Sequence, residues 1–306
     1  MAANFVVAVT DRNWFESLSL RPERDEVNFW SPSDSTFRAL VPGELFLFKL
    51  HAPISKIVGG GVFTHATGMP LHLAWETFGE SNGSSSAEEM LSRISQYRRL
   101  ESPIAAASNI ECRILAQPFF FRRENWLDEP PDWSPNIVRF KTYSTDTPVG
   151  SVLWNQVKDA LIVEGQVDYV DPSNRFGKPQ LIAPRLGQRA FRTQVIDAYR
   201  RRCAVTGERT LPALEASHIR PFSIGGTHDT SNGILLRKDL HSLFDRGFVT
   251  ISPEYRFDVC RSIRESYRDD SEYNELHGCR VKVPQLADQR PDPSALDWHN
   301  NNVFQR

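Results

Sequence analysis

The chain has 306 residues, of which 40% are hydrophobic and 24% charged, and its formal net charge at pH 7 is −2. This length predicts about two domains, and the charge excludes a uniformly basic protein, so any surface that binds nucleic acid must be local. No apolar run reaches the roughly 18 residues of a membrane helix, and Met1 to Phe5 shows no basic segment before an apolar one. We therefore expect a cytoplasmic protein with no membrane partner.

The N-terminal 145 residues contain apolar runs typical of strands, interrupted by two segments with helical periodicity. The strands are expected at residues 4–9, 44–50, 57–63, 109–115 and 137–140, and the helices at 11–20 and 87–100. Glycines at 59–61 indicate a turn or a bulge. The pattern predicts an α+β protein whose N-terminal domain, residues 1–145, is a mixed β-barrel with flanking helices.

The order of these elements resembles the PUA-like superfamily, which includes EVE and SRA domains. The resemblance rests on Pro42-Gly43-Glu44, which enters one strand, and on residues 59–63, which form the next. Members of this superfamily commonly hold one nucleobase in an aromatic-lined pocket, and several of them read modified bases.

The resemblance implies a base pocket, and two aromatic clusters next to loops are its candidate walls. An aromatic ring can stack on a base that has left the duplex, while an amide reads the polar edge of that base. The candidate pocket residues are Asn28, Phe29, Trp30 and Trp75. The alternative is that these side chains are ordinary parts of the barrel core.

Residues 146–184 are rich in Pro and Gly and contain one apolar stretch, at 152–163. This composition predicts a partly ordered connector, with the second domain beginning at residue 185.

Arginine is concentrated at the start of this second domain. Six arginines lie between residues 185 and 202, where Asp197 is the single acid. An apolar stripe at helical spacing is formed by Phe191, Val195, Ile196 and Tyr199. The remaining helix surface is either an ordinary solvated face or a phosphate-binding one, and we favour phosphate contact. The candidate phosphate ligands are Arg185, Arg189, Arg192 and, further along the chain, Arg220.

The segment 211–247 predicts two short strands, at 211–219 and 233–237, followed by a helix from residue 238. His218 ends the first strand, Asn232 ends the loop, and His241 and Asp245 share one helix face because they are four residues apart. Phosphodiester hydrolysis needs a base that takes a proton from water and a cation that stabilises charge on the phosphoryl oxygens. A neutral imidazole beside a cation bound on this helix supplies both.

The segment 185–247 resembles the HNH nucleases, whose fold is the ββα-metal unit. The motifs are residues 185–192, Cys203-Ala-Val-Thr-Gly207, His218-Ile-Arg-Pro221, Ser231-Asn-Gly-Ile-Leu-Leu236 and Leu240-His-Ser-Leu-Phe-Asp-Arg-Gly247. The resemblance implies that His218 is the general base, that Asn232 fixes the loop and thereby orients the base, and that His241 binds the metal. Asp245 falls where some members carry a further ligand.

The sequence departs from the family one residue before the base. That position is usually an Asp or His that binds the metal, whereas this chain has Ser217. Glu215 lies two residues earlier, on the same side of an ideal strand, and is the candidate replacement, directly or through water. The implied cofactor is a divalent cation, Mg²⁺ or Mn²⁺.

A structural zinc is not expected. The four cysteines, at positions 112, 203, 260 and 279, are scattered, and Thr206 stands where a partner of Cys203 is needed. Residues 248–306 are expected to begin with a strand at 248–251 and to pack against the nuclease helix, with a structural role for His299.

Taken together, the two resemblances predict a protein similar to the bacterial EVE-HNH and SRA-HNH modification-dependent restriction endonucleases, which serve in phage defence. Its expected substrate is double-stranded DNA with 5-hydroxymethylcytosine or 5-methylcytosine, and its expected state is a homodimer that cuts both strands. Two alternatives remain open. The first is a reader of modified nucleic acid that does not cleave, because Ser217 leaves the metal site incomplete. The second is a PUA-like nuclease directed at RNA.

Overall fold

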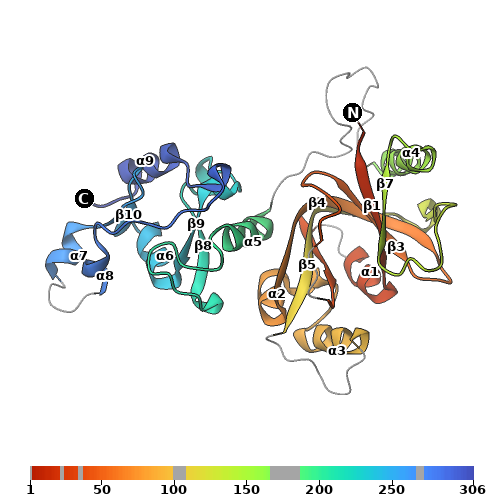
Figure 1. The fold of residues 1–306 in the computed structure, drawn as a ribbon, viewed down its shortest axis with the longest axis horizontal. Helices are drawn as coiled ribbons and strands as arrows, with labels where there is room; N and C mark the ends of the chain where they lie inside the picture. The colour runs from red at the N-terminus through yellow and green to blue at the C-terminus, as the bar shows by residue number, and fades with distance from the viewer. Residues whose placement is uncertain (1, 21–23, 34–36, 99–107, 166–186, 267–271) are drawn as a thin grey trace. The chain divides into compact units, whose positions relative to one another are not determined.

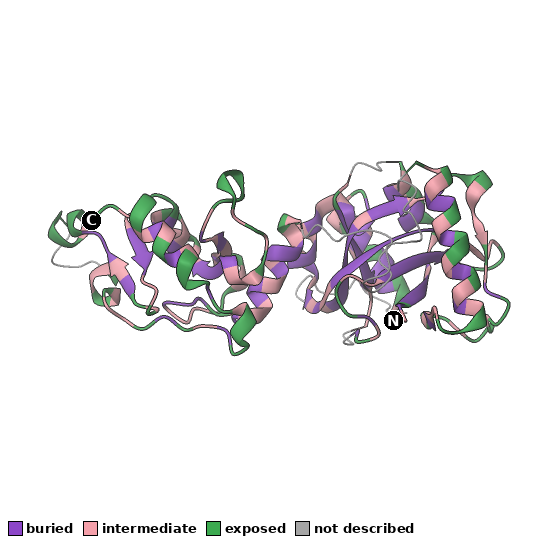
Figure 2. Cartoon of the chain, turned by 90° about the horizontal axis from the view of Figure 1, so that it is seen from above, coloured by how far each residue is buried: buried purple, intermediate pink, exposed green. Residues whose placement is uncertain are grey.

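The computed structural model describes residues 2–20, 24–33, 37–98, 108–165, 187–266 and 272–306 (Figure 1). Its contacts divide the chain into two compact units, Met1–Arg185 and Leu186–Arg306. Each unit has buried hydrophobic side chains of its own (Figure 2). The mixture of helices and mainly antiparallel strands confirms the α+β class. Among the helices in the described ranges, none is both long enough and apolar enough to span a membrane.

The first unit is built on one mixed sheet. Its elements are β1 (Asn4–Thr10), α1 (Arg12–Ser19), β2 (Glu26–Ser31), β3 (Leu45–Leu50), β4 (Lys56–Pro70), α2 (Leu71–Phe78), α3 (Ala87–Tyr97), β5 (Asn109–Phe120), β6 (Leu127–Asp128), β7 (Phe140–Ser144) and α4 (Pro148–Val163). The strand order is β2-β5-β4-β3-β1-β7, with β6 paired to β4. β1 and β3 run parallel, and the other pairs are antiparallel.

Both faces of the central strands are buried, which explains their continuous apolar sequence. Val6 and Ala8 of β1 join one core cluster, to which α1 contributes Trp14, Phe15 and Leu18. Phe5 and Val7, which point to the other face, join a second cluster that includes side chains of α4. Alternate side chains of β1 therefore pack on opposite faces of the sheet, one face covered by α1 and the other by α4.

The edge strands β2 and β7 are joined by side chains rather than by a backbone ladder in the described residues. Arg139, immediately before β7, donates hydrogen bonds to the hydroxyls of Ser31 (3.5 Å) and Ser33 (3.1 Å) at the end of β2. The rings of Phe37 and Phe140 lie 5.3 Å apart beside this link. These side-chain contacts link the two edges of a sheet whose backbone pairing stays open in the described residues, so no closed barrel is formed there.

The glycines at 59–61 permit close strand approach rather than a free turn. A Cβ on Gly60 would lie 2.7 Å from both the Phe46 carbonyl oxygen and the Phe119 ring. The register between β4 and β5 shifts between Gly60 and Val62. The predicted bulge is therefore confirmed, and it lies inside a 15-residue strand.

The other strand predictions for this unit are mostly confirmed. The runs at 4–9, 44–50, 57–63 and 109–115 form β1, β3, β4 and β5, and the helices at 11–20 and 87–100 correspond to α1 and α3. The strand expected at 137–140 is wrong, because β7 begins only at Phe140, opposite Ala8. Val138 is 72% exposed, so its apolar character did not reflect burial. β2 and α2 were not predicted.

The segment predicted to be a connector contains α4. Thr147 caps this helix, its Oγ1 accepting a hydrogen bond from the Gly150 N–H at 3.2 Å. Leu153 and Val157 are buried with Phe5 in the core of the first unit. Residues 166–184 of the proposed connector lie outside the described residues. A truncated first unit should therefore extend past Val163.

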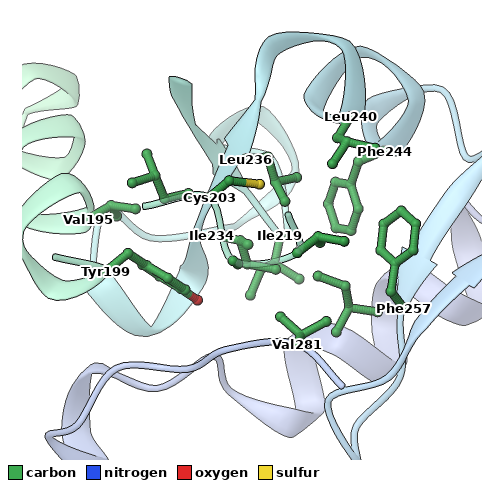
Figure 3. Close-up of a cluster of buried hydrophobic side chains, with 14 of the residues drawn as sticks. Val195, Tyr199, Cys203, Ile219, Ile234, Leu236, Leu240, Phe244, Phe257 and Val281 are labelled. Atoms are coloured by element: carbon green, nitrogen blue, oxygen red, sulfur yellow. The ribbon is translucent and has the colours of Figure 1, made fainter. Parts of the chain in front are cut away.

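The second unit holds the HNH-like segment. Its elements are α5 (Gln188–Ala198), β8 (Leu214–His218), β9 (Gly233–Arg237), α6 (Lys238–Asp245), β10 (Val249–Ile251), β11 (Phe257–Val259), α7 (Arg261–Ser266), α8 (Glu272–Leu276) and α9 (Pro293–Asn302). β8 and β9 pair antiparallel, with His218 opposite Gly233. Figure 3 shows side chains of α5, β9, α6 and β11 meeting in one cluster, among them Val195, Tyr199, Ile234, Leu236, Leu240, Phe244 and Phe257.

The C-terminal helix α9 packs on this core through His299, which is 2% exposed. Its Nε2 lies 3.1 Å from the Phe244 carbonyl oxygen and its Nδ1 2.8 Å from Thr250 Oγ1. Since a carbonyl only accepts, Nε2 carries the hydrogen and Nδ1 accepts from the hydroxyl. The ring also stacks on Phe244 at 3.8 Å. His299 thus ties α9 to α6 and β10, which is the structural role expected for it.

This burial predicts a pH dependence of stability. Burial lowers the pKa of His299 to about 4, against 6.5 for an exposed histidine. As the pH falls below 6.5, His299 becomes protonated in the unfolded chain but stays neutral in the folded chain. The free energy of unfolding therefore decreases between pH 6.5 and pH 4. We expect His299 to account for a loss of roughly 2–3 kcal/mol between pH 7 and 4.5. Denaturant unfolding at several pH values should show a shallower slope for His299→Gln, and an unchanged slope would contradict this assignment.

Candidate active site

Two strands and a helix bring the predicted site residues of the second unit together. His218 is the last residue of β8, Glu215 lies on the same strand, and His241 and Asp245 lie on α6. Asn232 immediately precedes β9. These residues lie within 30 positions of one another in the sequence. They come together because β8 and β9 pair antiparallel and α6 follows β9 directly.

His218 is held in a half-buried position. Its ring stacks on Phe191 of α5, with centroids 3.8 Å apart and planes 13° from parallel. Its Nε2 lies 3.0 Å from Nδ1 of His228. Burial, helped by the nearby charges of His228 and His241 and opposed by that of Asp245, lowers the pKa of His218 to about 4. The imidazole is therefore neutral near pH 7, the state in which it can accept a proton.

Asn232 clamps the two ends of the loop that follows His218. Its Oδ1 accepts a hydrogen bond from the Arg220 N–H at 3.0 Å. Its Nδ2 donates to the carbonyl oxygens of Arg220 and Thr227, at 2.9 and 2.8 Å. The side chain is buried, so these bonds face little competition from water. An amide side chain suits this position because it accepts one hydrogen bond through its oxygen and donates two through its nitrogen.

His241 is bracketed by two carboxylates. Its Nδ1 lies 2.8 Å from Glu215 Oε2, and its Nε2 lies 3.2 Å from Asp245 Oδ2. Burial alone would lower the pKa of His241, but the hydrogen bonds and charges of Asp245 and Glu215 outweigh it and raise the pKa. The i,i+4 spacing on α6 sets the second contact. Glu215 thus meets the predicted metal ligand, as its side of the strand suggested.

The donors of this cluster suit a divalent cation chemically. Carboxylate oxygens are the usual ligands of Mg²⁺ and Mn²⁺, and a neutral imidazole is a common ligand of transition metals. In the part of the chain that the structure describes, no three His, Cys, Asp or Glu side chains already form a metal-binding group. Instead, His241 Nε2 and Asp245 Oδ2 lie 3.2 Å apart, so a hydrogen on Nε2 points at the carboxylate. A cation bound by both would take the place of that proton, so metal binding is expected to release it.

Ser217 is fully buried, and its hydroxyl donates to the carbonyl oxygen of His218 at 3.5 Å. The side chain that reaches His241 from β8 is therefore that of Glu215. At the position where the resemblance leads us to expect a metal-binding side chain, this chain has Ser217. The carboxylate that contacts His241 comes from Glu215, two residues earlier on β8.

The predicted phosphate ligands have different settings. Arg189 and Arg192 lie half-buried on α5, and Arg185 lies outside the described residues. Arg220 is held beside the active site, since its Nε donates to the Ile224 carbonyl oxygen at 3.0 Å. Its guanidinium also lies 5.4 Å from the centre of the Trp298 ring. These two contacts fix the position of the Arg220 guanidinium.

The candidate base-pocket residues of the first unit fall into two settings. On β2, Asn28 and Trp30 are buried and bound to Asn82, with Asn28 Nδ2 donating to its Oδ1 and Trp30 Nε1 to its carbonyl oxygen, both at 2.8 Å. Phe29 points the other way and stacks on Phe48 in the core, 5.9 Å away. Trp75, on α2, is half-buried.

Two residues of the active site were not identified in the sequence. His228 lies in the Gly-rich loop, whose composition indicates only turns, and its distance of ten residues from His218 follows no helix or strand period. Phe191 was recognised as a core residue of α5, but its stacking on His218 depends on how α5 meets β8. Both contacts are tertiary, and no local pattern encodes them.

Comparison with known proteins identifies the segment that carries this site. The family model described as HNH endonuclease matches residues 203–252. This range contains β8, the loop, β9, α6 and β10, and with them every residue of the cluster described above except Phe191. Residues 203–252 are therefore an HNH-type nuclease segment, and the protein is a nuclease. No curated protein sequence matches the chain.

Two kinds of solved structure show limited similarity. The ASCH protein of Zymomonas mobilis is 9% identical and covers 49% of this chain and 94% of its own, with a TM-score of 0.32. A structure described as the modification dependent TagI restriction endonuclease is 12% identical and covers 92% of this chain and 76% of its own, with a TM-score of 0.26. Scores this low assign no activity to the chain.

Proposed function

We propose that the protein is a modification-dependent DNA endonuclease, in which the first unit recognises modified cytosine in a duplex and the second hydrolyses a phosphodiester bond nearby. One observation supports the cleavage step most strongly. Neutral His218 lies within electrostatic range of the His241 and Asp245 pair, inside the segment that matches the HNH endonucleases. A proton acceptor thus lies beside a candidate cation site, the combination that phosphodiester hydrolysis requires.

In this proposal His241 and Asp245 would hold a divalent cation, Mg²⁺ or Mn²⁺, while Glu215, bonded to Nδ1 of His241, would orient that ring and reach the ion through water. When bound, such an ion stabilises negative charge on the phosphoryl and leaving oxygens. His218 removes a proton from the attacking water, whose oxygen forms the new bond to phosphorus. The bond from phosphorus to the 3′ oxygen breaks and that oxygen takes a proton from a solvent water, which leaves 5′-phosphate and 3′-hydroxyl ends.

Asn232 and the arginines act on geometry. The clamp of Asn232 on Arg220 and Thr227 fixes the backbone just after His218, so the base keeps its direction. Arg189, Arg192 and Arg220, with Arg185, are proposed to contact phosphates, which supplies affinity without choosing a sequence. Because one such site cuts one strand, we propose that two chains act together on a duplex.

Selection of modified DNA is assigned to the first unit, on the PUA-like order of its elements. Trp75 is the proposed wall that stacks on the flipped base, because it is partly exposed while Trp30 is not. Asn28 and Trp30 support it through Asn82, whose Nδ2 donates to the carbonyl oxygens of Ala74 (3.1 Å), within α2, and Gly79 (2.8 Å), just after it. These hydrogen bonds, which run from β2 through Asn82 to α2, fix the position of the helix that carries Trp75.

We expect Trp75→Ala to erode the preference for modified DNA. Stacking of a base on an aromatic ring is worth about 1–3 kcal/mol, so affinity for modified DNA should fall roughly five- to hundred-fold. Binding should be measured in a His218→Ala background, to prevent cleavage, on matched duplexes with 5-hydroxymethylcytosine, 5-methylcytosine or plain cytosine. Salt must be held constant, since phosphate contacts are salt-sensitive.

Trp133→Ala is the matched control, since Trp133 is a half-buried tryptophan of the same unit. It should keep the preference for modified DNA. Equal affinity of the parent for all three duplexes would refute the reader assignment and leave the nuclease domain intact. A duplex RNA of the same sequence belongs in the same series, and preferential cleavage of it would redirect the proposal to RNA.

A further inference from the structure

The loop between β8 and β9 carries a second histidine that the mechanism above does not use. His228 is half-buried, and its Nδ1 lies 3.0 Å from Nε2 of His218. Its ring stacks on Phe222, with centroids 4.4 Å apart and planes 7° from parallel. Phe222 is itself 61% exposed, so the stack is built from the loop rather than from the core.

The backbone next to His228 is fixed from the other side of the loop. The carbonyl oxygen of Thr227 accepts the hydrogen bond of Asn232 Nδ2 at 2.8 Å. Asn232 also binds both backbone groups of Arg220, two residues after His218. One buried amide therefore sets the positions of His218 and His228 relative to each other.

We propose that His228 is the positioning residue of the general base: its Nδ1 accepts a hydrogen bond from the Nε2–H of His218, which leaves the lone pair of His218 Nδ1 to take the proton of water. This inference rests on the proposed role of His218. It adds that His228 orients the base, that His218 is the donor of their hydrogen bond, and that His218 carries its hydrogen on Nε2.

The direction of the bond follows from the proposed role of His218 together with the number of hydrogens on the two rings. A neutral imidazole carries one hydrogen on its two nitrogens, so the contact between Nε2 and Nδ1 holds one hydrogen from one ring. If His228 donated it, His218 Nε2 would be occupied as an acceptor and His218 Nδ1 would carry the hydrogen. No lone pair would then remain for water. Donation by His218 is the arrangement that keeps a neutral base reactive.

The hydrogen bond to His228 decides which ring nitrogen of His218 carries the hydrogen. Phe191 covers one face of the ring but sets no preference between its two nitrogens. The hydrogen bond to His228 supplies that preference. Partners that orient a metal-binding imidazole through its second nitrogen are typically worth 10- to 100-fold in activity, and we expect a similar effect for a general base.

Three substitutions at His228 in the full-length protein separate the hydrogen bond from ring packing. His228→Ala removes both, His228→Phe keeps an aromatic ring against Phe222 but has no acceptor, and His228→Asn places an amide oxygen where Nδ1 was. We expect the single-turnover cleavage rate to fall 10- to 100-fold for the Ala and Phe variants, with unchanged DNA affinity. The Asn variant should recover to within a few-fold of the parent.

The cleavage probe is a duplex in which every cytosine is 5-hydroxymethylcytosine, with Mn²⁺ present, and His218→Ala is assayed beside the three variants. If His218→Ala cleaves like the parent, the base assignment itself fails. If His218→Ala is inactive while His228→Phe cleaves like the parent, or while Asn fails to exceed Ala and Phe, only the role of His228 is overturned.

A spectroscopic measurement decides the tautomer without any substrate. Imidazole ¹⁵N chemical shifts distinguish a protonated from an unprotonated ring nitrogen. For the parent near pH 7.5, we expect His218 to carry its hydrogen on Nε2, and for His228→Phe we expect a mixture of both tautomers. A parent in which the hydrogen resides on His218 Nδ1 would overturn the proposal.

Discussion

Replacing His218 with Ala is expected to lower the rate of DNA cleavage by about 10² to 10⁴-fold, the usual contribution of a general base. DNA affinity should change little, because the ring is directed at Phe191 and His228 rather than at the arginines proposed to hold phosphates. Single-turnover kinetics separates the two quantities. Cleavage by His218→Ala at the parental rate would show that the base is another group.

The same base assignment has a pH signature. Because the pKa of His218 is lowered to about 4, the base stays unprotonated well below pH 6.5. The acid limb of the pH–rate profile should therefore lie near pH 4 to 5. His277→Ala is a suitable control, since His277 lies in the same unit and bonds to the Val259 N–H. It should leave both the rate and the profile unchanged.

Replacing His241 with Ala is expected to have the second largest effect, on both the rate and the metal requirement. The imidazole is the group that joins Glu215 to Asp245, so its loss leaves two carboxylates without a common partner. Metal stabilisation of the transition state is worth several kcal/mol, so we expect a loss of about 10²-fold or more at fixed metal concentration. Asp245→Asn should show a smaller loss in the same direction.

Titration of the cleavage rate with Mg²⁺ and Mn²⁺ measures this effect. Half-maximal activity of His241→Ala should require more metal than that of the parent. Ser242→Ala is the matched control, because Ser242 is exposed on the same helix and should titrate like the parent. An unchanged metal requirement in His241→Ala would exclude His241 as a ligand.

Much of the nuclease unit could be predicted from sequence because its signals are local. The strand at 233–237 and the helix from 238 are confirmed as β9 and α6, and Gly247 has the left-handed φ of 73° expected where that helix stops. The strand predicted at 211–219 is shorter, since β8 starts at Leu214. The four-residue spacing of His241 and Asp245 gave their contact directly, because a helix brings such pairs together.

The remaining features depend on contacts between elements far apart in sequence. The partner of His218 in the loop, His228, follows from how Asn232 closes that loop. α2 has only eight residues, too few for a clear period, and β2 buries polar Asn28 among apolar neighbours, which hid its strand character. Whether Trp75 stacks on a base depends on exposure at the end of α2, which composition does not encode.

The central claim is that the protein cuts DNA because of a modified base that the first unit reads. The most direct test is cleavage of matched duplexes, containing 5-hydroxymethylcytosine, 5-methylcytosine or plain cytosine, by the full-length protein with Mg²⁺ or Mn²⁺. We predict rapid cleavage of at least one modified duplex, little cleavage of the plain one, and no cleavage by His218→Ala. Equal cleavage of all three duplexes by the parent, or cleavage that survives His218→Ala, would contradict it.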